Sequence, residues 1–146
     1  MLGMLIAILS GALMSVQGVF NTGVTKQTNI WISSSFVQIT AFVVCISGWL
    51  VAGRDASFSS LFKIDNKYML LGGAIGAFIT FTVVVAMGNL GPAKATMLIV
   101  TSQLITSYLV ELFGLFGTDK VEFQIRKLIG VVVIIAGILI FKWEVE

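Results

Sequence analysis

Residues 92–117 read PAKATMLIVTSQLITSYLVELFGLFG, an apolar run in which Gln103, Ser107 and Glu111 are embedded. About 20 predominantly apolar residues allow a helix to cross a hydrocarbon core of about 30 Å, so this run is long enough to span a membrane. An acidic side chain at the centre of such a helix costs roughly 2.5 to 3.5 kcal/mol on insertion scales. Ionisable groups in membrane helices are therefore candidate functional groups.

The whole chain has the composition of an integral membrane protein. Of its 146 residues, 58% are hydrophobic and 11% are charged, and the mean hydropathy is +1.04. The chain has no histidine and a single cysteine, Cys45, so zinc sites and nucleophile–histidine pairs lack their usual residues. We therefore expect no enzyme, no metal and no cofactor. The net charge of +2 comes from scattered residues and indicates no nucleic-acid partner.

Five apolar segments predict an all-α, polytopic membrane protein, a bundle of five transmembrane helices in a single domain over residues 1–146. The predicted spans cover residues 2–24, 31–52, 68–88, 93–116 and 128–141, approximately. The first is expected to be a retained span, because it lacks the basic start of a signal peptide. A polar connection is expected at residues 26–29. Gly72 and Gly76 in the third segment, and Gly130 and Gly137 in the fifth, are expected to be helix-packing positions.

The basic residues predict a cytoplasmic N-terminus. With five spans, six basic residues lie on the side of the N-terminus and three on the other side. The six are Arg54, Lys63, Lys67, Lys120, Arg126 and Lys127, and the three are Lys26, Lys94 and Lys142. Because the excess is only three charges, insertion in both orientations is left open.

Polar side chains form one stripe on the fourth predicted helix. At 100° per residue, Thr96, Gln103, Ser107 and Glu111 stay within an arc of about 100°. Glu111 is expected between the core and the interface of the membrane, where it can exchange a proton. The alternative is that Glu111 reaches the headgroup region or pairs with a basic residue near Gly117.

Carboxamides also occur on defined faces of two other predicted helices. Gln17 and Asn21 lie one turn apart in the first segment, and Gln38 lies in the second. Together with Gln103 they predict a shared interior cavity. The alternative is that each amide is an interhelical hydrogen bond, worth about 0.6 to 1.7 kcal/mol.

Several motifs resemble one known family. In the N-terminal half they are GALMSVQGVFN at 11–21, Trp31 and SSSF at 33–36. In the C-terminal half they are NLGP at 89–92, Gln103, Glu111, FGLFG at 113–117, Arg126 and GVVVIIAG at 130–137. Over nearly the whole chain, these residues resemble the YdcZ family of short five-helix membrane proteins in the drug/metabolite transporter superfamily.

The resemblance implies a half-transporter of the inner, or cytoplasmic, membrane that pairs to complete a pathway. Family members of this length look like half-transporters that work as homodimers, in parallel or antiparallel orientation, as partners encoded in pairs, or as fused duplicates. In the family the acidic position of the fourth span is commonly aspartate, so Glu111 is a conservative departure. The first-helix glutamate of the short multidrug exporters of the superfamily is absent here. Gln17 and Asn21 occupy that span instead.

We therefore expect a secondary transporter of a small organic solute or metabolite, acting as a dimer by proton-coupled alternating access. Glu111 is expected to carry the proton. The expected substrate-binding residues are the polar side chains Gln17, Asn21, Gln38, Gln103 and Ser107. A dimeric ion or solute channel and an accessory half-subunit of a heteromeric transporter are the alternatives. The expected partners are membrane lipid, the small-molecule substrate and a second copy of the chain.

Overall fold

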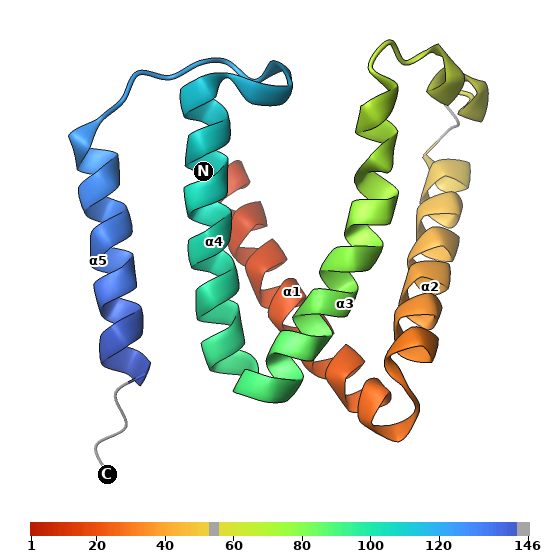
Figure 1. Cartoon of the computed structure of the whole chain (residues 1–146). Helices are drawn as coiled ribbons and strands as arrows, with labels where there is room; N and C mark the ends of the chain where they lie inside the picture. The colour runs from red at the N-terminus through yellow and green to blue at the C-terminus, as the bar shows by residue number, and fades with distance from the viewer. Residues whose placement is uncertain (53–55, 143–146) are drawn as a thin grey trace. The chain divides into compact units, whose positions relative to one another are not determined.

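The computed structural model describes residues 1–52 and 56–142, which form five α-helices and three 3-10 helices and contain no strand. The all-α prediction is therefore confirmed for the described residues. The chain divides into two units, residues 1–89 and residues 90–146. The first holds α1, α2 and nearly all of α3, and the second holds α4 and α5 (Figure 1).

Two helices joined by a tight turn begin the first unit. Helix α1 covers Leu2–Gln27 and α2 covers Ile30–Val51. The amide of Thr28 donates to the carbonyl of Val24 at 3.0 Å and ends α1. Oδ1 of Asn29 accepts from the amide of Ile32 at 2.9 Å and starts α2, as an N-cap asparagine does. The predicted connection at residues 26–29 is therefore too long, because its first two residues complete the last turn of α1.

A longer connection leads from α2 to α3, which covers Gly72–Leu90 (Figure 1). It contains two 3-10 helices, Phe58–Lys63 and Lys67–Leu71. Nε1 of Trp49 donates to the carbonyl of Ala56 at 2.9 Å, and the ring of Trp49 packs edge-on against that of Phe58, with centroids 5.0 Å apart. These contacts hold the connection against the end of α2. Of the basic residues behind the predicted orientation, Arg54 lies outside the described residues.

The second unit is a pair of helices, α4 over Pro92–Phe113 and α5 over Ile125–Lys142. Pro92 occupies the first turn of α4, where a missing amide hydrogen costs nothing. Gly114 ends α4 with φ 62°, a left-handed conformation that favours glycine. A short 3-10 helix, Leu115–Gly117, follows. The amide of Val121 then donates to the carbonyl of Glu111 at 3.0 Å, which holds the connection to α5 against the end of α4.

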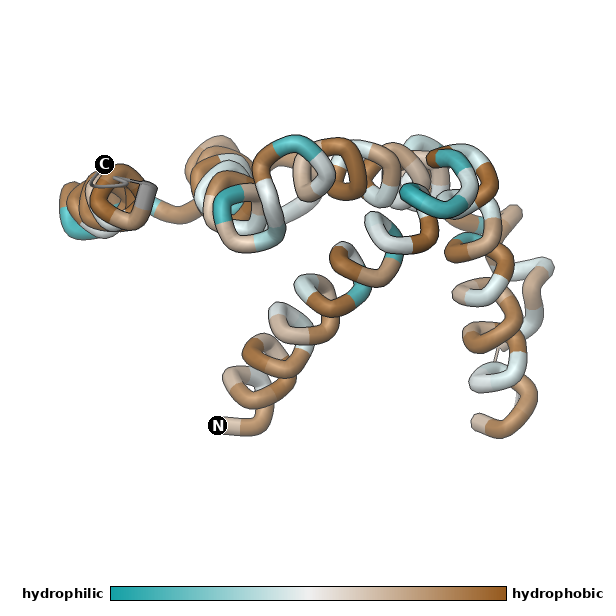
Figure 2. Tube along the Cα trace, turned by 90° about the horizontal axis from the view of Figure 1, so that it is seen from below, coloured by the Kyte–Doolittle hydropathy of each residue, from teal (hydrophilic) through white to brown (hydrophobic). Residues whose placement is uncertain are grey.

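Four helical segments among the described residues are long and apolar enough to cross a membrane: Leu2–Gln27, Ile30–Val51, Lys67–Leu90 and Pro92–Phe113. Hydrophobic residues predominate along them, as Figure 2 shows. The chain is therefore a multi-pass membrane protein by length and composition. Helix α5 is apolar but shorter, at 18 residues, and begins with basic side chains. The fifth span stays a prediction, and so does the single domain.

The large apolar side chains face outward, as expected for helices solvated by lipid. On α3, Phe78 is 72% exposed, whereas the buried side chains are Val84 and Met87. A Cβ atom added at Gly72, Gly76, Gly130 or Gly137 would meet no described atom within 4 Å. Their expected packing role therefore stays a prediction.

Close packing in the first unit occurs instead at Gly18, which lies on α1. A Cβ atom there would lie 2.5 Å from Sδ of Met87 and 3.3 Å from Cγ1 of Val83, so α1 approaches α3 where it has no side chain. Gly18→Leu should lower the melting temperature of the purified protein, because overpacking costs about 1 to 3 kcal/mol.

Gly11→Leu is the matched control, since nothing described lies within 4 Å of a Cβ atom at Gly11 on the same helix. Adding Met87→Ala to Gly18→Leu should restore most of the lost stability. Equal melting temperatures for Gly18→Leu and Gly11→Leu would show that α1 and α3 do not pack in this way.

Candidate functional site

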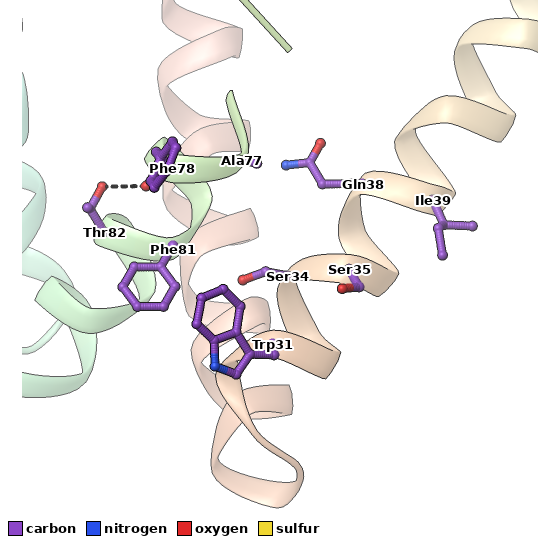
Figure 3. Close-up of a pocket in the computed structure, with 9 residues that line it drawn as sticks. All are labelled: Trp31, Ser34, Ser35, Gln38, Ile39, Ala77, Phe78, Phe81 and Thr82. Carbon is purple, nitrogen blue, oxygen red and sulfur yellow. Dashed lines mark hydrogen bonds between the residues drawn. The ribbon is translucent and has the colours of Figure 1, made fainter. Parts of the chain in front are cut away.

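A pocket with a volume of about 730 Å³ lies between α2 and α3 in the first unit (Figure 3). We name it the α2–α3 pocket. Aromatic, aliphatic and uncharged polar side chains form its walls: Trp31, Ser34, Ser35, Gln38, Ile39, Ala77, Phe78, Phe81 and Thr82. Its volume and mixture of residues are typical of a site for a small organic molecule.

Two contacts across the α2–α3 pocket fix its shape. The rings of Trp31 and Phe81 are tilted by 38° with centroids 5.3 Å apart. Nε2 of Gln38 donates to Oγ1 of Thr80 at 3.2 Å, and Oγ1 of Thr80 donates in turn to the carbonyl of Gly76 at 3.0 Å. Gln38, predicted to bind substrate, therefore holds the two helices together through its amide nitrogen. Its amide group points towards α3 in Figure 3.

Gln17 and Asn21 line a different pocket, of about 560 Å³, between α1 and α2. We name it the α1–α2 pocket. Asn21 is 8% exposed, and its backbone carbonyl accepts a hydrogen bond of 3.1 Å from Oγ of Ser33, which is itself buried. Within the first unit the predicted amides are thus divided between two pockets, because α2 presents Ser33 towards α1 and Gln38 towards α3. The predicted shared cavity is not formed by the residues of this unit alone.

The polar stripe of the second unit lies along α4. Gln103, Ser107 and Glu111 all have exposed side chains. Oε2 of Glu111 lies 3.5 Å from Nζ of Lys127, which comes from the first turn of α5. Nζ of Lys127 also lies 5.0 Å from the centroid of the Tyr108 ring, a distance typical of cation–π contacts. The acidic residue of the stripe is therefore an ion-paired residue at the end of its helix.

Each charge of the Glu111–Lys127 pair lies at the helix end where the helix dipole disfavours it. Glu111 lies in the last turn of α4, where the helix dipole disfavours a negative charge, and Lys127 lies in the first turn of α5, where it disfavours a positive one. The side chains are 51% and 38% exposed, respectively. Pairing compensates each charge locally, but an exposed pair of this kind contributes only about 0 to 1 kcal/mol.

Sequence reasoning missed several residues of these sites, among them Thr80, Phe81 and Lys127. Phe81 and Thr80 lie on α3, and the span predicted there, residues 68–88, contains no carboxamide. Lys127 was used to predict the orientation, and the alternative of a basic partner for Glu111 named no residue. A signal for the α2–α3 pocket was present, because Trp31, Ser34 and Gln38 recur at spacings of three and four and so share one face of α2.

The described part of the chain contains no candidate metal site. No group of three or more Asp, Glu, Cys or His side chains gathers there.

Comparison with known proteins gives one match. The model of a family described as "Putative inner membrane exporter, YdcZ" matches residues 2–140. Neither the comparison with curated proteins nor that with solved structures returned a match. The family match covers most of both units, including every residue that lines the two pockets and the Glu111–Lys127 pair.

Proposed function

The chain belongs to the YdcZ family of inner membrane proteins, and we propose that it transports a small organic solute across the cytoplasmic membrane by proton-coupled alternating access as a homodimer. The family description and the apolar helices together support a transporter. The substrate class, the coupling and the dimer are the parts that we add.

The α2–α3 pocket is the observation that carries the proposal. It combines a volume of about 730 Å³ with aromatic walls and a small number of polar groups, between two helices of membrane-spanning length. Sites of transporters lie among such helices near the middle of the membrane. We assign Gln38 to substrate binding in this pocket. Gln17 and Asn21 are assigned to a second contact region in the α1–α2 pocket.

The exposed polar stripe of α4 supports dimerisation. Gln103 and Ser107 are exposed although they lie on a membrane-spanning helix, where polar side chains normally face protein or a water-filled cavity. In the proposed homodimer these side chains face the pathway. The open backbone at Gly72 and Gly76 offers a surface for close helix contact. The weak excess of basic residues fits a cytoplasmic N-terminus and also an antiparallel pair.

We assign proton coupling to Glu111. Protonation would remove its charge and release Lys127 from the pair, and Lys127 would then be free to move towards the interface. Such a change in pairing gives the proton a way to bias two arrangements of α4 and α5, which is the requirement for coupling.

The test is solute-dependent proton flux. The purified chain is reconstituted in liposomes that contain a pH-sensitive dye, and amphipathic organic solutes that are uncharged, cationic or anionic are added one class at a time. A transporter should change the internal pH only when its solute is present, and the rate should saturate. A solute-independent ohmic current would indicate a channel, and flux that appears only with a second protein would indicate an accessory subunit; either result would overturn the proposal.

A further inference from the structure

The charge of the α2–α3 pocket restricts what can bind there. None of the side chains that line it is ionisable. An ion that entered would leave water without meeting an opposite charge, which is strongly unfavourable. The walls therefore favour an uncharged solute.

The aromatic side chains restrict the shape of the solute. Trp31 and Phe81 are already in ring contact, and Phe78 comes from the same face of α3 as Phe81 (Figure 3). Aromatic side chains prefer offset-stacked or edge-to-face contacts with other rings, and a planar ring can make either kind here.

Polar groups in the wall of the pocket would orient a bound solute through hydrogen bonds. Oγ of Ser34 is shielded from solvent and has no hydrogen-bond partner among the described residues. Because an unpaired shielded hydroxyl is unfavourable, a hydrogen bond from a ligand would be a net gain. The amide of Gln38 lies one helical turn further along α2, and its nitrogen already donates to Thr80, so its carbonyl oxygen is the group suited to accept from a solute N–H or O–H.

We infer that the α2–α3 pocket binds an uncharged, planar aromatic solute, with the ring against Trp31 and Phe81 and a polar substituent directed to Gln38 and Ser34. This inference rests on the proposed transport function in so far as it names the substrate class, whereas binding itself is measured without transport.

Indole and two analogues of the same ring test the charge rule. Binding of tritiated indole to the full chain in nanodiscs is measured by equilibrium dialysis, with empty nanodiscs as the blank for partition into lipid. Unlabelled indole should compete, whereas cationic tryptamine and anionic indole-3-acetate should compete about tenfold more weakly or worse. Tighter binding of tryptamine or indole-3-acetate than of indole would overturn the inference.

Two phenylalanine variants locate the binding. Phe81→Ala should weaken indole binding by about tenfold or more, because it removes a wall of the pocket. Phe42→Ala is the matched control, because it removes a 64% exposed ring of α2 that lines neither pocket, and it should bind indole as the wild type does. Equal losses for Phe81→Ala and Phe42→Ala would show that indole binds only to the apolar surface.

Ser34→Ala keeps the test independent of folding, since the hydroxyl that it removes has no partner to lose among the described residues. It should weaken indole binding while leaving the melting temperature unchanged, and unaltered binding would contradict the assigned polar contact. Indole that binds in this pattern but drives no proton flux would leave the pocket assignment standing and overturn the transport function. Solute-dependent flux that Phe81→Ala does not change would support the transport function and overturn the assignment of the substrate to this pocket.

Discussion

Glu111→Gln should reduce solute-dependent proton flux to the level of empty liposomes. Glutamine has the shape of glutamate but does not take up or release a proton near neutral pH. The lost ion pair with Lys127 is half-exposed, so the substitution should lower the free energy of unfolding by no more than about 1 kcal/mol. A loss of flux in a folded protein would therefore report on coupling and not on stability.

Exchange measurements separate coupling from binding. If Glu111 only carries the proton, Glu111→Gln should still exchange labelled for unlabelled solute across the membrane when no proton gradient is present. Glu122→Gln is the control, because Glu122 is an exposed carboxyl of the connection before α5 and lies outside the α4 stripe. Wild-type proton flux in Glu111→Gln would exclude the coupling role.

The helices were predictable from the sequence because length and hydropathy are local properties. The first two predicted spans, 2–24 and 31–52, overlap α1 and α2, and the error of three residues at the end of α1 came from treating Lys26 and Gln27 as loop residues. Polar residues continue a helix wherever its backbone hydrogen bonds continue, and the bond from Thr28 to Val24 shows that these do. Amino-acid composition does not indicate whether these backbone hydrogen bonds continue.

The division of the amides between two pockets was not predictable in this way. A helical wheel places Ser33 and Gln38 on different faces of α2, but it does not say which helix covers each face. That depends on contacts such as the approach of Gly18 to Met87 and the bond from Gln38 to Thr80, which join residues far apart in the sequence. Tertiary partners of this kind have no signal in one sequence.

The partner of Glu111 depends on the path of a connection. Gly114, Phe116 and Gly117 all have positive φ, and they turn the chain back so that the connection binds the end of α4. Lys127 then reaches Glu111 across sixteen residues of sequence. The predicted fourth span, 93–116, ends three residues beyond α4, and the positive φ of Phe116, which a side chain disfavours, had no signal in the sequence.

Exchanging the two charges should separate a structural ion pair from a coupling one. Lys127→Glu or Glu111→Lys alone places two like charges about 3.5 Å apart, so each single variant should melt below the wild type. The double variant restores an opposite pair. It also puts a lysine in the last turn of α4 and a glutamate in the first turn of α5, the arrangement that both helix dipoles favour by about 0.3 to 1 kcal/mol each. The double variant should therefore melt at or above the wild-type temperature.

Proton flux in the double variant should nevertheless stay at the background level, because the carboxyl has moved from the polar stripe of α4 to α5. In the wild type, each charge is opposed by its own helix dipole. Such a result would explain why this unfavourable arrangement is kept, because a carboxyl on α4 shares a face with Gln103 and Ser107 whereas one on α5 does not. Stability would be given up for the position of the acid, as is common at functional sites. Recovery of flux together with stability in the double variant would instead show that the pair only joins α4 to α5. Parallel melting curves and dye-liposome assays on the four proteins, wild type included, distinguish the two outcomes.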